Sequence, residues 1–243
     1  RFLPGLVGNV AIPKMSAGAT GYWVTEAAAI TGSEPTLGQV TGTPHTCGVL
    51  VDISRKLINQ STPAAEMIAR DEMLERIART IQIAVFAGTG SDGQPSAITT
   101  ATGINNPAVT QGAPTYAELL GFPGAIFADN AEGSVMRWAM TAEVWAKLAA
   151  TATNGAGSPL ALDPVSRRLI GYEYATSEDL PANSLWFGDW STVNIGVWGA
   201  GVDVNVDDKT LSSSGGLRLV ALQDVDVMVR LGQKLAYNTA VTA

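Results

Sequence analysis

One stretch, residues 62–87, constrains the fold more than any other, because it predicts an uninterrupted helix of unusual length. Thr62 can cap its N-terminus, and Pro63 falls at the first helical position, where the missing N–H costs no hydrogen bond. Gly88 and Gly90 follow the last turn and end the helix. One face carries an apolar stripe of Met67, Leu74, Ile77, Ile81 and Val85. At about 1.5 Å per residue the helix is roughly 40 Å long, which predicts a structural spine.

The charged residues of this stretch support the same prediction. Glu66 lies in the first turn, where the helix dipole favours a carboxylate. Glu72 with Arg76 and Glu75 with Arg79 are spaced four apart in the favourable order, so we expect two ion pairs along the exposed side of the helix.

The segments before the helix predict extended structure. Residues 1–17 contain two prolines and no periodicity, so we expect an arm that lies against another part of the protein. Within residues 18–54, Tyr22–Thr25 has strand propensity, residues 32–35 have turn chemistry, and later residues alternate between apolar and polar. This pattern predicts a long two-stranded ribbon followed by a strand that enters a sheet. Because an isolated ribbon is marginal in water, it needs a partner surface, either on its own domain or elsewhere.

The rest of the chain mixes helices and strands without an internal repeat of 20–50 residues. We expect short helices at Tyr116–Leu120 and Thr141–Thr151, the second capped by Thr141, and a buried strand or helix start at Val135–Met140. Residues 153–168 read as a loop. Strand-like runs follow from Leu169 to Tyr237. The order of β segments, long helix, loop, mixed segments and β segments predicts the α+β class.

Composition excludes several functions. Only 15% of the residues are charged, the net charge is −7 and the pI is about 4.7, which disfavours a basic nucleic-acid-binding face. The apolar runs are too short to span a membrane. Cys47 and His45 are the single cysteine and histidine, so an internal disulfide and a cysteine-based zinc site are excluded, and any histidine-based triad would need His45.

The remaining motifs carry little chemistry. Residues 88–93 match G-x-G-x-x-G, but they follow a helix and open a loop, which is the reverse of a dinucleotide site. Asp203, Asn205 and Asp207 resemble the start of a calcium loop that lacks its later glycine and glutamate. The acidic pairs 178–179 and 207–208 are adjacent residues, unsuited to glycosidase geometry. We therefore predict a protein that is not an enzyme and uses neither a metal nor a cofactor.

The order of segments resembles the tailed-phage major capsid proteins of the Hong Kong 97-type fold, over nearly the whole chain. Each piece is weakly specific, and their joint order carries the resemblance. The pieces are residues 12–15 (IPKM), 19–26 (ATGYWVTE), 51–58 (VDISRKLI), 93–95 (GQP), 138–141 (WAMT) with Trp145 and Leu148, 169–172 (LIGY), 180–181 (LP) and 185–190 (LWFGDW).

The resemblance implies a part for each segment of this α+β chain. An N-terminal arm and an extended loop over a neighbouring subunit would precede a peripheral domain built on the spine helix. An axial domain would meet its copies around fivefold and sixfold axes. The implied boundaries are residues 1–17 for the arm, 18–46 for the extended loop, 47–112 and 217–243 for the peripheral domain, and 113–216 for the axial domain.

The resemblance also implies a function. Copies of the chain would assemble into hexamers and pentamers of an icosahedral shell around double-stranded DNA, bound without sequence specificity. A portal, a maturation protease and a decoration protein are the further partners, and no membrane is involved. Assembly would occur in the host bacterial cytoplasm, and the product would be the virion. Arg1 in place of Met is then expected from proteolytic removal of a scaffolding segment, the other explanation being a truncated chain.

Two residue-level expectations follow from the resemblance. Some family members cross-link through a lysine of the extended loop, and residues 18–46 contain no lysine, so we predict a shell held together without covalent bonds. The candidate subunit contacts near the extended loop are Trp23, Glu26, Glu34, Arg55 and Lys56.

Two alternatives stay open at this point. An encapsulin-like compartment has the same fold and encloses protein cargo, so nucleic acid in purified particles would separate it from a phage shell. A carbohydrate-active α+β domain would instead use acidic residues such as Glu178, Asp203 and Asp207. Such a domain would stay near 25 kDa in sedimentation, whereas a shell protein would form megadalton particles.

Overall fold

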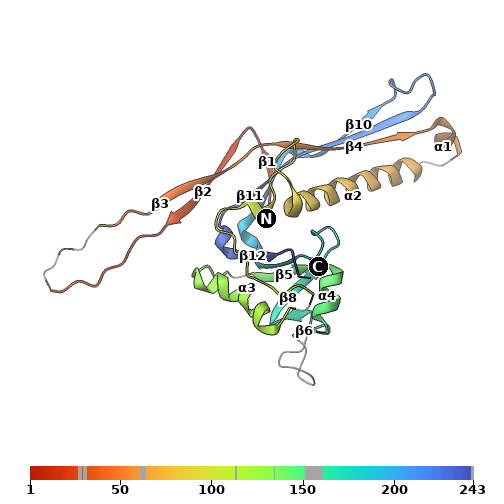
Figure 1. Ribbon diagram of the computed structural model, residues 1–243. Coiled ribbons are helices and arrows are strands. Elements are labelled where there is room, and N and C mark those ends of the chain that lie inside the picture. Colours follow the sequence, from red (N-terminus) through yellow and green to blue (C-terminus); the bar gives the residue numbers. More distant parts are fainter. Residues whose placement is uncertain are drawn as a thin grey trace.

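The computed structural model describes residues 1–26, 29, 32–60, 64–112, 114–133, 135–150 and 161–241. Within these residues, a four-stranded sheet has the order β1-β10-β11-β4, a six-stranded sheet has the order β12-β9-β5-β8-β7-β6, and β2 pairs with β3 in a two-stranded ribbon. The ribbon projects to one side of the molecule and the four-stranded sheet with helix α2 extends to the other (Figure 1). The six-stranded sheet, with helices α3 and α4, lies below the point where these two arms meet (Figure 1).

The elements have the following bounds. The strands are β1 (Phe2–Leu6), β2 (Val10–Ala17), β3 (Thr36–Gly42), β4 (His45–Ile53), β5 (Met136–Met140), β6 (Leu162–Asp163), β7 (Arg168–Leu169), β8 (Tyr172–Thr176), β9 (Leu185–Asp189), β10 (Val193–Asp207), β11 (Leu217–Val229) and β12 (Leu235–Asn238). The helices are α1 (Arg55–Gln60), α2 (Ala64–Ala87), α3 (Tyr116–Ala128) and α4 (Ala142–Leu148), with short 3₁₀ turns η1 (Ile98–Thr100), η2 (Trp190–Thr192) and η3 (Gly232–Lys234).

Helix α2 is the predicted spine, and its contact with the four-stranded sheet is narrower than expected. Its buried row recurs at every fourth residue, through Met73, Ile77 and Val85 with Ile81 partly buried, and it packs on β4 and β11. Met67 and Leu74 were expected in this stripe but are 64% and 42% exposed. Leu74 follows Met73 and therefore lies about 100° further round the helix, away from the sheet. The expected cap residues Thr62 and Pro63 and the side chain of Glu66 lie outside the described part of the chain.

One of the two expected ion pairs on α2 is confirmed. The Nε of Arg76 lies 2.7 Å from a carboxylate oxygen of Glu72. Arg79 does not pair with Glu75 as expected, because its Nε donates to Asp179 at 2.6 Å. Asp179 belongs to the loop after β8, so this ion pair connects the spine helix to the six-stranded sheet.

Strand β10 contains an irregularity that divides the four-stranded sheet into two parts. Trp198 lies opposite Asp224 and Asp203 lies opposite Leu222, so residues 199–202 of β10 bulge against the single residue Gln223 of β11. The strand nevertheless continues through the bulge from Val193 to Asp207. Beyond it, the sheet packs on α2 through Leu219 and Ala221.

The six-stranded sheet has the most completely buried core of the molecule. Phe122 of α3, Trp138 of β5 and Phe187 of β9 are fully buried, and the Trp138 and Phe187 rings lie 4.4 Å apart. Helix α3 continues to Ala128, well beyond the predicted Leu120, because its buried residues extend to Ile126. Val135–Met140 forms a strand, β5, at Met136–Met140.

Capping by Thr141 is confirmed, since its side-chain oxygen accepts a hydrogen bond from the backbone N–H of Val144. The loop expected at residues 153–168 is described from residue 161 onward, where β6 and β7 pair.

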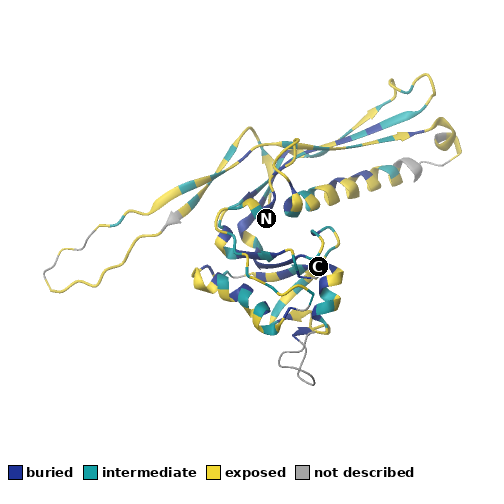
Figure 2. Ribbon diagram, viewed as in Figure 1, coloured by how far each residue is buried: buried dark blue, intermediate teal, exposed yellow. Residues whose placement is uncertain are grey.

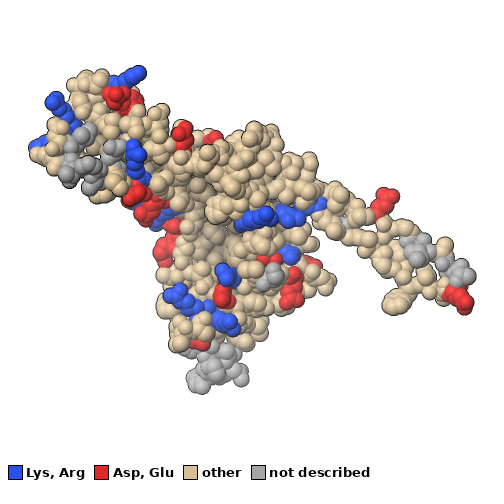
Figure 3. Space-filling view, turned by 180° about the vertical axis from the view of Figure 1, so that it is seen from behind, with Lys and Arg blue, Asp and Glu red and all other residues tan. Residues whose placement is uncertain are grey.

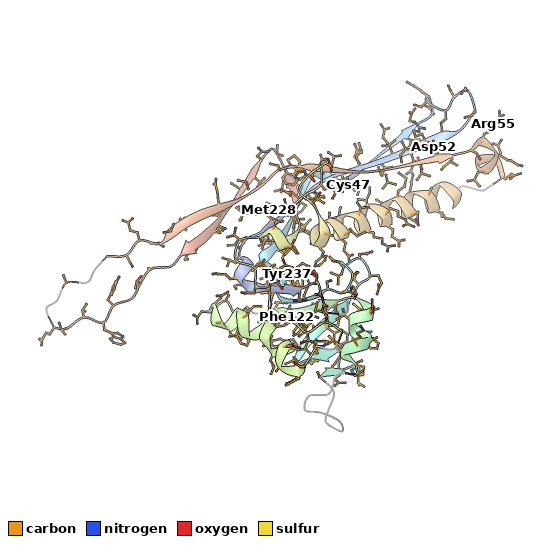
Figure 4. All side chains as sticks on the ribbon, in the orientation of Figure 1. Cys47, Asp52, Arg55, Phe122, Met228 and Tyr237 are labelled. Atoms are coloured by element: carbon orange, nitrogen blue, oxygen red, sulfur yellow. The ribbon has the colours of Figure 1, made fainter. Side chains whose placement is uncertain are left out.

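An aromatic cluster connects the end of the spine helix to the six-stranded sheet. Phe86 contacts Trp186 edge-on at 5.1 Å and Trp190 at 5.8 Å. Trp186 stacks on Tyr237 of β12 at 4.9 Å (Tyr237 is labelled in Figure 4). Buried Val85 and Val193 belong to the same cluster, so the two sheets and the helix meet in one apolar joint.

The N-terminal segments differ from the expectation in one respect. Residues 2–6 lie against the body as predicted, since β1 pairs in parallel with β10. The ribbon begins earlier than expected, because Val10–Ala17 pairs antiparallel with Thr36–Gly42 and is one of its two strands. The strand expected at Tyr22–Thr25 is wrong: these residues have no strand structure, and none of the described residues pairs with them in a sheet.

Candidate subunit-contact surfaces

The five candidate contact residues are all exposed, but they occupy opposite ends of the molecule. Trp23, Glu26 and Glu34 belong to the segment between β2 and β3, which forms the far end of the ribbon (Figure 1). Arg55 and Lys56 open helix α1 at the other extremity (Arg55 is labelled in Figure 4). Within one chain, the two groups of residues therefore do not meet. A contact between them requires two copies of the chain.

The ribbon exposes its apolar side chains to solvent. Trp23 is 105% exposed, which means that it has no contact that shields it from water. Tyr22, Val24, Leu37 and Met15 are also exposed, and Figure 2 shows exposed residues along most of the ribbon. A two-stranded ribbon without a core of its own is marginally stable in water, so this surface is suited to burial against another molecule.

Two hydrogen bonds fix the base of the ribbon to the body. The indole Nε1–H of Trp198 donates to the carbonyl of Gly8 at 2.6 Å. The backbone N–H of Thr43 donates to Oδ2 of Asp226 at 2.8 Å, and Asp226 is buried. The sequence analysis missed this anchor. The one signal of this anchor in the sequence is Asp226, which lies between the apolar residues Val225 and Val227 of β11. A carboxylate buried at such a position needs hydrogen-bond partners.

His45 and Cys47 lie two positions apart on strand β4, so they share a face of the four-stranded sheet. The His45 Nε2 lies 4.0 Å from Oδ1 of Asp226. Partial burial raises the pKa of the Cys47 thiol. Both residues line a hollow of about 280 Å³ between β4 and the end of α2, together with Thr80 and Gln94. Among the residues that the structure describes, no group of three or more potential metal ligands occurs.

Two of the three acidic residues considered for catalysis, Glu178 and Asp207, serve in local structure. Glu178 accepts the backbone N–H of Ala142 at 2.9 Å and so helps to begin α4. Asp207 accepts hydrogen bonds from the backbone N–H groups of Lys209 and Thr210 in the turn after β10. Its hydrogen bonds lower the pKa of its carboxyl, and the bond from the Thr210 hydroxyl contributes most.

The glycine motif likewise forms a tight turn. A side chain at Gly88 would clash with the carbonyl oxygen of Pro95, because the chain folds back against the end of α2 here. In the described part of the chain, no helix is both long and apolar enough to cross a membrane.

Charged groups are sparse over much of the surface. On the face seen in Figure 3, large areas show neither basic nor acidic side chains. The projecting ribbon shows acidic but no basic groups toward its end. A folded body with an anchored, unshielded apolar ribbon defines a structural subunit that works by contact with other molecules.

Comparison with known proteins identifies the family of this subunit. The model described as "Phage capsid family" matches residues 1–237, so the chain belongs to the phage capsid family. The major capsid protein of Halomonas phage phiHAP-1 is 31% identical to it over 245 aligned residues. That alignment covers 98% of this chain and 38% of the relative, so the chain spans well under half of the relative's length.

Solved capsid structures share the fold. The capsid of a native GTA particle has a TM-score of 0.79 at 17% identity, covering 100% of this chain and 88% of that one. The structure from Mycobacterium phage Adephagia has a TM-score of 0.75 at 15% identity, with coverages of 100% and 88%. These similarities confirm the predicted mixed α and β fold of a phage capsid protein. The match to the phage capsid family, rather than the shared fold, favours the phage capsid over the encapsulin-like compartment and the carbohydrate-active domain.

Proposed function

We propose that this chain is the principal wall subunit of an icosahedral phage shell, with copies arranged in hexamers and pentamers. The observation that carries the proposal is the anchored ribbon with its unshielded tryptophan, in a chain of the phage capsid family. A surface of this kind is stable when a neighbouring copy covers it. The shell is non-enzymatic, without cofactor or metal, and assembles in the host bacterial cytoplasm around double-stranded DNA.

Each segment has a proposed part in the shell. Residues 1–17 are the arm, 18–46 the extended loop, 47–112 with 217–243 the peripheral domain and 113–216 the axial domain. The pairing of Val10–Ala17 with β3 supports a revised boundary, in which the arm ends before Val10 and the loop begins there. A portal, a maturation protease and a decoration protein are the proposed further partners.

The contact that we propose joins the ribbon end of one copy to helix α1 of another. Glu26 and Glu34 are the charged groups of residues 18–46, which contain no Lys or Arg. Arg55 and Lys56 are adjacent and exposed, and their positive charges are opposite in sign to those of the two glutamates. Charge complementarity at the rim selects the register between the copies, and burial of Trp23 contributes affinity.

Charge reversal tests this contact. We expect that the E26K/E34K variant and the R55E/K56E variant each fail to form large particles in sedimentation and negative-stain micrographs. The combined four-substitution variant should recover assembly, because the opposite charges again meet. E132K, on an exposed acid of the region between α3 and β5, is the matched control and should assemble normally. Assembly of both charge-reversal variants at the level of the parent would overturn the proposed contact.

The proposed shell is held together without covalent bonds. Because residues 18–46 contain no lysine, boiled particles should give one band near 25 kDa on a denaturing gel. A ladder of multimers would contradict this. A chain that stays monomeric under every assembly condition would contradict the shell itself.

A further inference from the structure

The ribbon joins the body at two places, and a different kind of hydrogen bond holds each of them (Figure 1). Between β1 and β2, the indole N–H of Trp198 donates to the backbone carbonyl of Gly8. Between β3 and β4, the backbone N–H of Thr43 donates to a carboxylate oxygen of Asp226. Neither group of the first bond titrates near neutral pH, whereas the second bond depends on an ionised acid. The connection between β3 and β4 is therefore the one whose strength can respond to a change of charge.

Asp226 is buried without a full charge partner. Its two carboxylate oxygens accept backbone N–H groups, one from Thr43 at 2.8 Å and one from Val227 at 2.7 Å. Among the described residues, no lysine or arginine pairs with it. Neutral donors satisfy the hydrogen bonding of a carboxylate but supply no positive charge, and burial makes a missing counter-charge costly. A cation that formed beside Asp226 would therefore strengthen the anchor.

The single histidine of the chain lies at that position. The Nε2 of His45 is 4.0 Å from Oδ1 of Asp226 and 3.4 Å from the hydroxyl oxygen of Thr43. The side chains of His45 and Asp226 are 28% and 10% exposed, so the pair is largely shielded from water. Protonation of the imidazole places a positive charge within ion-pair distance of the buried carboxylate. The ring thus lies beside both residues that form the anchor.

The other charged groups that face His45 are acidic. Asp92, in the turn after α2, lines the same hollow as His45, and Asp224 of β11 accepts a hydrogen bond from the Thr46 hydroxyl. Helix α2 contributes only uncharged side chains to this hollow, and no lysine or arginine of the described residues lines it. On β4 itself, burial raises the pKa of the Cys47 thiol, away from neutral pH. Because carboxyl groups ordinarily titrate near pH 4, a change of charge here between pH 5.5 and 7.5 belongs to the imidazole.

We propose that His45 and Asp226 form a pH-sensitive latch at the base of the ribbon. When the pH falls through the ordinary range of histidine titration, near pH 6.5, the imidazolium pairs with the carboxylate and holds the ribbon more firmly to the body. When the pH rises, the imidazole loses its charge, the anchor keeps only its backbone hydrogen bonds, and the ribbon opens more often. This inference goes beyond the proposed function, because the latch lies within one chain and acts whether or not copies assemble.

Amide hydrogen exchange of the purified chain tests the latch, with each rate corrected for the intrinsic effect of pH. We expect the amides of Thr36–Gly42 to be about two- to fivefold better protected at pH 5.5 than at pH 7.5, the factor that a partly exposed ion pair supplies. This gain should follow the titration of the His45 ring signal in NMR spectra, which is unambiguous in a chain with one histidine. The amides of β5 are the internal control and should show no gain.

Three variants identify the partners. His45→Gln removes the titrating group and Asp226→Asn removes the charge, while each keeps a polar side chain of similar size. Both should lose the gain in protection, and H45Q/D226N should behave as either single variant does. Asp92→Asn, on the facing turn, is the matched control and should keep the gain.

Three results would overturn the latch. They are a parent chain without the gain, an H45Q variant that keeps it, and a D92N variant that loses it while D226N does not. None of these results bears on shell assembly, which the charge-reversal experiment on the ribbon end decides separately.

Discussion

The domain around the six-stranded sheet and the ribbon β2–β3 use tryptophan in opposite ways. Trp138 is fully buried between Phe122 and Phe187, and its indole N–H donates to the carbonyl of Leu169. Trp23, on the ribbon, is fully exposed. Trp138 completes a core within one chain, whereas Trp23 packs against none of the residues that the structure describes. Apolar residues therefore serve two different interfaces here, and the comparison predicts different consequences when each is removed.

The largest effect on the stability of the chain is expected in the core of the six-stranded sheet. Phe122→Ala should lower the free energy of unfolding by about 3–5 kcal/mol, because it opens a cavity beside Trp138. Denaturant titration followed by tryptophan fluorescence measures this. Phe127→Ala on the same helix is the matched control, since Phe127 is 42% exposed, and it should cost far less. Equal losses from both would mean that this core does not stabilise the chain.

A smaller and more local effect is expected at the base of the ribbon. Asp226→Ala removes the buried carboxylate that accepts from the Thr43 N–H, and the loss of a hydrogen bond to a charged group costs about 1.5–3 kcal/mol. Amide hydrogen exchange should accelerate in Thr36–Gly42 while amides around Trp138 stay protected. If exchange rose equally in both regions, the ribbon would not be a separately anchored unit.

Acid should weaken the six-stranded-sheet domain through Glu118 without involving the ribbon. Hydrogen bonds, first from the Thr110 hydroxyl and then from the Thr115 backbone, lower the pKa of Glu118 from 4.5 to about 2. A carboxyl with a lowered folded pKa stabilises the protein above its unfolded pKa, and this stabilisation is lost as the pH falls from about 4.5 toward 2. The difference in Tm between the parent and E118Q should therefore shrink over that interval. A constant difference would contradict this role.

The smallest effect on chain stability is expected at the ribbon end. Trp23→Ser should leave the free energy of unfolding of the monomer within about 0.5 kcal/mol of the parent, because this side chain buries nothing there. Particle formation should nevertheless fall, as measured by sedimentation under assembly conditions. A monomer that is clearly destabilised by Trp23→Ser would show that Trp23 stabilises the single chain, as Trp138 does.

Local sequence patterns predicted those elements whose determinants lie close together in the chain. The Thr141 cap and the Glu72–Arg76 pair depend on residues three or four apart, and both are confirmed. The predicted apolar stripe on α2 was partly wrong, because β4 and β11 decide which side of the helix is covered. Likewise, Arg79 prefers Asp179, a partner 100 residues away that helix spacing cannot reveal.

The candidate contact residues were predictable as exposed apolar or charged groups, but their arrangement was not. Trp23 and Arg55 are 32 positions apart in sequence, but the segment between β2 and β3 and helix α1 lie at opposite ends of the molecule. The ribbon leaves the body at the hydrogen bond between Thr43 and Asp226, whereas Arg55 opens helix α1 beyond the far end of β4. The anchor between Thr43 and Asp226 joins residues 183 positions apart, so no local pattern indicates it.

By itself, the sequence determined the spine helix, the α+β class, the scarcity of charge and the order of segments that resembles phage capsid proteins. The first three follow from periodicity, capping and composition, which act over a few residues at a time, and the resemblance rests on the order of short sequence pieces. The tertiary structure alone decided that Val10–Ala17 belongs to the ribbon, that α2 buries every fourth residue, and that Asp226 anchors the ribbon at Thr43. The physical reason is that burial depends on which distant surfaces meet, and strand register across β4, β10 and β11 sets those meetings.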